Sequence, residues 1–95
     1  MQYLALIHKN TDTTPTSAEW ERFFEVAAET GMFKGGSEIG LRHTVGKKVV
    51  CDKTQDVGGF MRFDSEDLDQ IKEILEQHPV VKHGGTIELL EMPES

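Results

Sequence analysis

The chain has 95 residues, of which 17 are acidic and 10 basic, giving a formal net charge of −7. A negative field of this size repels phosphate backbones and anionic lipid surfaces, so the composition argues against nucleic acid and membranes as partners. The hydrophobic fraction of 37% is typical of a globular protein, and the length predicts a single domain over residues 1–95. Because the only cysteine is Cys51 and no signal-peptide pattern is present, we expect a cytoplasmic protein without an internal disulfide.

The first two elements carry clear signals. Gln2–His8 is predicted to be a strand with apolar side chains on both faces, which is typical of a central strand covered on both sides. Residues 9–16 are rich in threonine and form a loop. Thr16 and Glu19 predict a capping box at the start of a helix, and Gly31 suits the left-handed residue after its end. The predicted buried face of this helix consists of Trp20, Phe23, Phe24, Ala27 and Ala28.

The middle of the chain predicts a hairpin followed by another strand. Met32–Gly36 is interpreted as a glycine-bearing link. Glu38–Val45 and Lys48–Asp52 are predicted to pair across a two-residue turn at Gly46-Lys47. A short polar loop then leads into a predicted strand at Val57–Phe63.

The last third predicts one helix and one strand. The helix is expected to begin at Asp64 or Ser65, where acidic side chains favour the positive end of the helix dipole. It is expected to end near His78, because Pro79 disfavours helical geometry in the residue before it. Thr86–Met92 then forms the last strand.

The order β-α-β-β-β-α-β predicts an α+β, ferredoxin-like sandwich, in which right-handed crossovers place both helices on one face of the sheet. The other face is also apolar, since Leu4, Leu6, Phe60 and Leu90 alternate with the residues expected to face the helices. No further helix is predicted to cover these side chains. We therefore expect a homodimer formed through the open sheet face.

Several short segments form a recognisable set. They are Gly31, Gly35-Gly36, Cys51-Asp52, Gly58-Gly59-Phe60, and Pro79 with Gly84-Gly85-Thr86-Ile87-Glu88. Together they run over nearly the whole chain and resemble the YCII-related family, in particular the branch named for an Asp-Gly-Pro-Phe (DGPF) motif.

The resemblance implies a ferredoxin-like fold that dimerises through its sheets into an α/β barrel. A few members of this family look like enzymes that act on hydroxylated aromatic substrates through a His and Asp pair, and others are associated with transcription-initiation sigma factors. This chain departs from the pattern in two places. Lys53-Thr54-Gln55 stands where the motif has Gly-Pro-Phe, and the first helix has no histidine. Only Asp52, the first residue of the motif, matches.

His43 and Asp52 are the predicted catalytic pair. If the hairpin turns at Gly46-Lys47, the two residues share one face as diagonal neighbours, about 7–8 Å apart at the backbone. A carboxylate that holds one imidazole nitrogen makes the ring a competent general base, and such proton transfer requires no cofactor. The alternative interpretation is a solvent-facing histidine and an aspartate that caps the strand end.

Three further residues are candidates for substrate binding. His8 ends the first strand, where central strands of such sheets often open onto a cleft. Arg42 and Arg62 lie on predicted strands, and their paired donors suit a carboxylate or phenolate. The alternatives are an exposed histidine and arginines that pair with an acid across the strand. A metal site is not predicted, because His78 and His83 lack further ligands at a recognisable spacing.

Two functions of different classes follow from these patterns. One is a small cofactor-independent enzyme that uses His43 and Asp52 on a small polar or aromatic substrate. The other is a noncatalytic ligand-sensing or protein-interaction module, associated with transcription in some members of the family it resembles. A pocket onto which the titratable side chains converge favours the first, and a partner surface without such groups favours the second.

Overall fold

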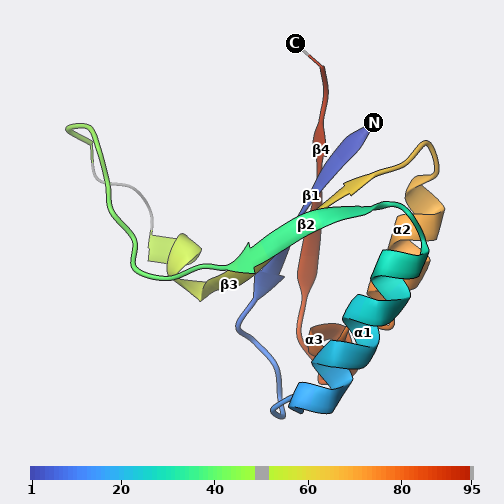
Figure 1. The fold of residues 1–95 in the computed structure, drawn as a ribbon. Coiled ribbons are helices and arrows are strands. Elements are labelled where there is room, and N and C mark those ends of the chain that lie inside the picture. The colour runs from blue at the N-terminus through green and yellow to red at the C-terminus, as the bar shows by residue number, and fades with distance from the viewer. Residues whose placement is uncertain (49–51, 95) are drawn as a thin grey trace.

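The computed structural model describes residues 1–48 and 52–94. The described residues form four strands and three α-helices (Figure 1), with a short 3-10 helix, η1, before the third strand. In chain order the elements are β1 (Gln2–His8), α1 (Ser17–Glu29), β2 (Phe33–Glu38), η1 (Asp52–Asp56), β3 (Val57–Asp64), α2 (Leu68–Leu75), α3 (Pro79–Lys82) and β4 (Ile87–Met92).

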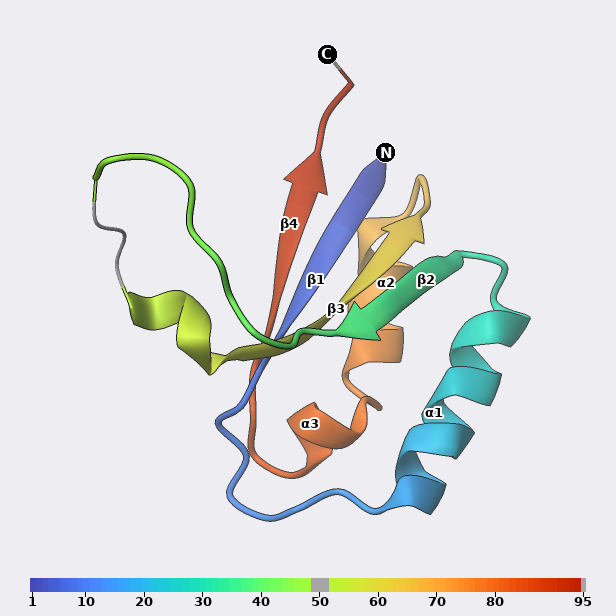
Figure 2. The ribbon, with the colours of Figure 1, turned by 60° about the vertical axis from the view of Figure 1, so that its left-hand side comes forward.

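The strands form one sheet in the order β2-β3-β1-β4, and every neighbouring pair is antiparallel. β1 lies between β3 and β4 as its apolar composition predicted. The helices pack on one side of this sheet (Figure 2), and no described helix covers the other side. This arrangement confirms the predicted α+β, ferredoxin-like fold class. None of the described helices is both long enough and apolar enough to cross a membrane.

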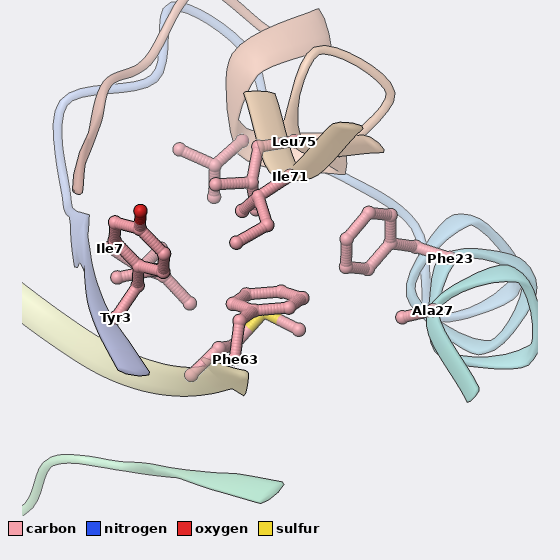
Figure 3. Close-up of a cluster of buried hydrophobic side chains, with 10 residues drawn as sticks. Tyr3, Ile7, Phe23, Ala27, Phe63, Ile71 and Leu75 are labelled. Atoms are coloured by element: carbon pink, nitrogen blue, oxygen red, sulfur yellow. The ribbon is translucent and has the colours of Figure 1, made fainter. Parts of the chain in front are cut away.

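The core lies between the sheet and the helices (Figure 3). Alternate residues of β1 point into it, and their register partners Met61 and Phe63 on β3 do the same. Ile71 and Leu75 of α2 and Phe23 and Ala27 of α1 close the core from the helix side. Because the pleat alternates, the intervening residues of the same strands face away from the helices.

Helix α1 begins and ends as its sequence predicted. The Thr16 hydroxyl accepts a hydrogen bond from the Glu19 backbone N–H at 3.2 Å, and the Glu19 carboxylate accepts one from the Thr16 backbone N–H at 3.2 Å. Gly31 has a φ of 73°, the left-handed geometry that favours glycine after a helix. Two predicted core residues differ, because Phe24 is 42% exposed and Ala28 is exposed too.

The predicted hairpin is wrong where the structure describes it. The strand is Phe33–Glu38, and residues 39–48 contain none. The glycines of this segment were interpreted as a link, but Gly36 lies in β2 against the backbone of β3. A Cβ there would stand 2.2 Å from the Phe60 carbonyl oxygen, so close strand contact favours glycine at this position. The other predicted strand, Lys48–Asp52, runs through residues 49–51, which lie outside the described part.

The second helical region is divided into two. α2 begins at Leu68 because the Asp67 carboxylate accepts hydrogen bonds from the backbone N–H groups of Asp69 and Gln70, so the predicted start was about three residues early. After a turn the chain forms α3, a helix that the residue pattern did not predict. Pro79 suits its first position, since the N–H that proline lacks has no partner there in any case.

Candidate functional site

A pocket of about 600 Å³ opens at one end of the sheet, where β1 and β2 end and β3 begins. Its walls are mainly apolar and include four aromatic residues from three elements. Two small residues make room for it, because Gly58 and Gly59 at the start of β3 put no side chain into the space. The aromatic residues are Trp20 and Phe24 of α1, Phe33 of β2 and Phe60 of β3. An aromatic-lined hollow of this size suits a small organic molecule.

Few polar groups border the pocket, and His8 is the one with acid–base character near neutral pH. Its Nε2 lies 2.5 Å from Oε1 of Glu88 on the neighbouring strand β4. The backbone fixes this pair, since the His8 N–H donates to the Thr86 carbonyl at 3.0 Å. The His8 side chain is 21% exposed, so the ring is accessible yet partly shielded.

The contact with Glu88 determines what His8 can do chemically. An ionised carboxylate accepts a hydrogen bond from Nε2–H, which leaves the Nδ1 lone pair of the neutral ring free to take a proton from another molecule. Such an imidazole–carboxylate pair is the arrangement of a general base whose ring orientation is fixed. The charged groups of Lys9 and Glu38 also border the pocket and suit a ligand with polar substituents.

The predicted catalytic pair is not brought together by a strand register. His43 lies on the exposed segment of residues 39–48, which has no strand. Asp52 begins η1, and its side chain lies outside the described part. The strand that was expected to place His43 beside Asp52 is therefore absent from residues 39–48. A contact between the two side chains stays a prediction.

The two predicted arginines both donate to backbone carbonyls. Arg42 Nη2 donates to the carbonyls of Thr54 and, at 2.6 Å, Val57, which ties the segment of residues 39–48 to the start of β3. Arg62 Nη2 donates to the Lys34 carbonyl at 3.1 Å. Neither arginine lines the 600 Å³ pocket. A role in substrate binding therefore stays a prediction for both.

His78 lies deep in the helical layer. Its ring is 0% exposed and packs against Trp20 and Phe23, with ring centroids 4.8 and 4.5 Å away. Its Nδ1 accepts the Val80 backbone N–H at 3.1 Å and so caps α3. Burial lowers the pKa of His78 from 6.5 to about 4, because the surroundings do not solvate an imidazolium. The ring is thus neutral at pH 7 and supports the wall that carries Trp20.

The sequence predicts that His8 lies near a cleft, but it gives no signal for the partner carboxylate or for the aromatic wall. His8 and Glu88 are 80 positions apart in the chain, and only the pairing of β1 with β4 brings them into contact. The wall was missed because Phe24 was assigned to the core from its helical spacing. Among the described residues, no three His, Cys, Asp or Glu side chains are placed to hold a metal ion together.

Comparisons with known proteins support the fold. No protein-family model matches the chain, and no curated protein matches it by sequence. Among solved structures it is similar to 5-chloro-2-hydroxyhydroquinone dehydrochlorinase (TftG) from Burkholderia phenoliruptrix, solved in complex with 2,5-dihydroxybenzoquinone. The TM-score is 0.51 at 16% identity, and the alignment covers 100% of this chain and 96% of that enzyme. At this identity the likeness establishes the α+β fold alone.

Proposed function

We propose that this protein is a small cofactor-independent enzyme that moves protons on a hydroxylated aromatic substrate bound in the 600 Å³ pocket. The observation that carries the proposal is the His8–Glu88 pair, with its 2.5 Å contact, at the edge of an otherwise aromatic-lined hollow. Support also comes from the solved structure of similar fold, an enzyme in complex with a dihydroxybenzoquinone. The features that resemble the YCII-related family agree with this substrate class.

In the proposed reaction, the substrate ring lies among Trp20, Phe24 and Phe33, where flat aromatic surfaces pack well. His8 accepts a proton from a hydroxyl or ring carbon of the substrate through Nδ1. Glu88 holds the opposite nitrogen and stabilises the imidazolium that forms. The proton then returns to another atom of the substrate or passes to water. Only protons move, so the reaction requires no metal or organic cofactor.

Binding is tested first, using the single tryptophan as the reporter. Trp20 is the only tryptophan in the chain and lines the pocket. We expect 2,5-dihydroxybenzoquinone and hydroxyhydroquinone to perturb the Trp20 indole signal in two-dimensional NMR spectra at saturable concentrations. Phe24→Ala should weaken binding, whereas Phe23→Ala would mainly reduce stability because Phe23 lies in the core. Absence of any saturable shift at Trp20 would contradict the proposed ligand class.

Catalysis is tested by exchange of ring hydrogens for deuterium in D₂O, followed by NMR of the same compounds. His8→Gln should slow exchange by about a hundredfold or more, the usual contribution of a general base, while binding at Trp20 persists. Glu88→Gln should slow it less, and Glu91→Gln on the same strand serves as a matched control. Binding without exchange in the unmodified protein would identify a ligand-binding module instead of an enzyme.

The same assay tests the earlier candidate pair. His43→Gln and Asp52→Asn are expected to leave exchange within about twofold if His8 is the base, because a group that does not contact the substrate contributes no proton transfer. If those variants abolish exchange and His8→Gln does not, the catalytic role belongs to His43 and Asp52.

A homodimer through the open sheet face is part of the proposal. Leu4 and Leu6 of β1, Phe60 of β3 and Leu90 of β4 lie on the face opposite the helices, and Leu90 is 40% exposed. A second copy of this chain would remove these side chains from water at about 25 cal/mol per Å² of apolar area. We expect sedimentation analysis to give a dimer, and Leu6→Lys to give a folded monomer. A monomer at high protein concentration would contradict the dimer without affecting the pocket.

A further inference from the structure

A second cluster of chemically capable side chains lies outside the pocket. Thr13 belongs to the loop between β1 and α1, Glu19 to the first turn of α1, and His83 to the turn that follows α3. None of the three lines the 600 Å³ pocket. They come from segments up to 70 residues apart, so the fold alone brings them together.

The three side chains form a continuous chain of short contacts. His83 Nδ1 lies 2.6 Å from the Thr13 hydroxyl, and His83 Nε2 lies 2.6 Å from Glu19 Oε2. The other carboxylate oxygen of Glu19 accepts hydrogen bonds from the backbone N–H and the hydroxyl of Thr16, both at 3.2 Å. The capping box of α1 thus fixes the orientation of the carboxylate that holds the imidazole.

The charge on Glu19 decides where the protons lie. The hydrogen bond from His83 is the main cause that holds the pKa of Glu19 below its ordinary value, and the bonds from Thr16 add to it. An ionised Glu19 accepts the Nε2–H of neutral His83, so Nδ1 presents its lone pair to the Thr13 hydroxyl, which donates. The resulting order of hydroxyl, imidazole and carboxylate is that of an activated nucleophile with an oriented base.

The surrounding backbone holds this arrangement in place. The Asp12 N–H donates to the His83 carbonyl at 2.8 Å, next to the side-chain contact of Thr13. Two hydrogen bonds between Asn10 and Thr86, at 3.1 and 2.9 Å, hold the same loop two residues before Asp12. Thr13 is exposed and the His83 side chain is 21% exposed, so a small molecule can reach the hydroxyl from solvent.

We propose that Thr13, His83 and Glu19 form a second site that hydrolyses small carboxylic esters through an acyl-threonine intermediate. The Thr13 oxygen forms a bond to the ester carbonyl carbon while its proton passes to His83 Nδ1. The carbon–oxygen bond to the leaving alcohol then breaks, and that alcohol takes the proton from His83. Water attacks the acyl-threonine in the same way, which releases the acid and restores the Thr13 hydroxyl. Glu19 is a positioning residue and stabilises the imidazolium in both halves.

The test uses p-nitrophenyl acetate as the probe and two readouts. Release of nitrophenol is followed in stopped flow, and the acetylated residue is identified by peptide mapping after acid quench. We expect an initial burst with an acetyl group on Thr13. Thr13→Val should abolish that adduct and lower the burst rate by about a hundredfold or more, whereas Thr13→Ser should retain it. His83→Gln should behave like Thr13→Val.

Controls separate this site from its structural role and from the pocket. Thr14→Val changes a neighbouring exposed threonine in the same loop and should leave the burst unchanged. Glu19→Gln should lower the acylation rate constant with little change in the ester concentration that gives half the maximal rate, while circular dichroism monitors folding. His8→Gln should leave the acetyl group on Thr13 in place, although it slows the exchange proposed for the pocket. Acetyl groups found only on lysines or the N-terminus, at rates that Thr13→Val does not change in a folded protein, would overturn the proposal.

Discussion

The two faces of the sheet are made from alternate residues of the same strands but have different surroundings. Ala5 and Met61 face the helices and are 0% and 1% exposed. Their neighbours Leu6 and Phe60 are register partners on the open face and remain partly accessible. Both faces are apolar, so hydrophobicity by itself does not determine burial. Burial depends on the elements that pack against each face. Within one chain, the described helices cover only one face.

The faces also differ in chemistry. On the helix-covered face, Phe63, Ile71 and Leu75 are buried in the core and carry no ionisable group. Glu88 is the register partner of Leu6 and therefore belongs to the open face, where its carboxylate meets His8 at the edge of the pocket. Both side chains keep part of their surface exposed there, so water still reaches the pair. The proposed chemistry thus lies where the core ends.

The largest expected difference between the faces is in the free energy of unfolding. A matched pair of substitutions on β3 measures it. Phe63→Ala removes a ring that is 1% exposed and should lower the free energy of unfolding by about 3–5 kcal/mol. Phe60→Ala removes the same group from the open face and should cost about 1 kcal/mol at low protein concentration. Urea denaturation measures both. Equal losses at a concentration where the protein is monomeric would remove the distinction between the faces.

The pH dependence of stability tests the helix-covered side of the sheet further, because His78 is buried there. Its pKa is about 4 in the folded protein and 6.5 when unfolded, so between these values the unfolded chain binds more protons and stability rises with pH. The contribution is fully present above pH 6.5 and is lost as the pH falls to about 4. The loss amounts to roughly 3 kcal/mol at about 1.36 kcal/mol per pKa unit.

A variant at the same position is the control for this pH dependence. His78→Asn keeps an acceptor for the Val80 N–H, and asparagine is a good helix cap, but it does not titrate. Its denaturation midpoint should change less between pH 7 and pH 4.5 than that of the unmodified protein. An identical pH dependence in the two proteins would mean that other groups cause the acid sensitivity.

Two glycines test how closely the strands pack. Gly36→Ala places a methyl group 2.2 Å from the Phe60 carbonyl oxygen and should cost about 1–3 kcal/mol, because backbone must move to accommodate it. Gly40 lies beyond the end of β2, where an added Cβ meets nothing within 4 Å. Gly40→Ala should stay within about 0.5 kcal/mol. Thermal melts of the two variants give the comparison directly, and the same melting temperature for both would contradict the close approach of β2 to β3.

The smallest effect is expected for Leu90→Lys at the edge strand. The side chain is 40% exposed, so the melting temperature at micromolar concentration should change by only a few degrees. Its dependence on protein concentration should disappear if the open face joins two copies. A melting temperature that still rises with concentration in the Leu90→Lys protein would place the contact elsewhere.

Local patterns predicted the elements whose signals lie within one turn or one strand. Thr16 and Glu19 fixed the start of α1 because a capping box needs only four consecutive residues. The strand at β1 and its two apolar faces followed from composition. The strand at Phe33–Glu38 did not follow from composition. Gly36 is needed there because the Phe60 carbonyl of a different strand lies close to it. The predicted start of α2 was early because several acidic residues are possible caps and only Asp67 is used.

The sequence by itself determined the α+β class, the positions of most elements and the two-faced character of the central strand, because these depend on residue spacing and local hydrogen bonding. Only the tertiary structure decided which ionisable groups meet. His8 with Glu88 and His83 with Thr13 and Glu19 join residues 64 to 80 positions apart. Such contacts depend on strand order and on how the turn after α3 packs against the loop before α1, and no spacing along the chain encodes them.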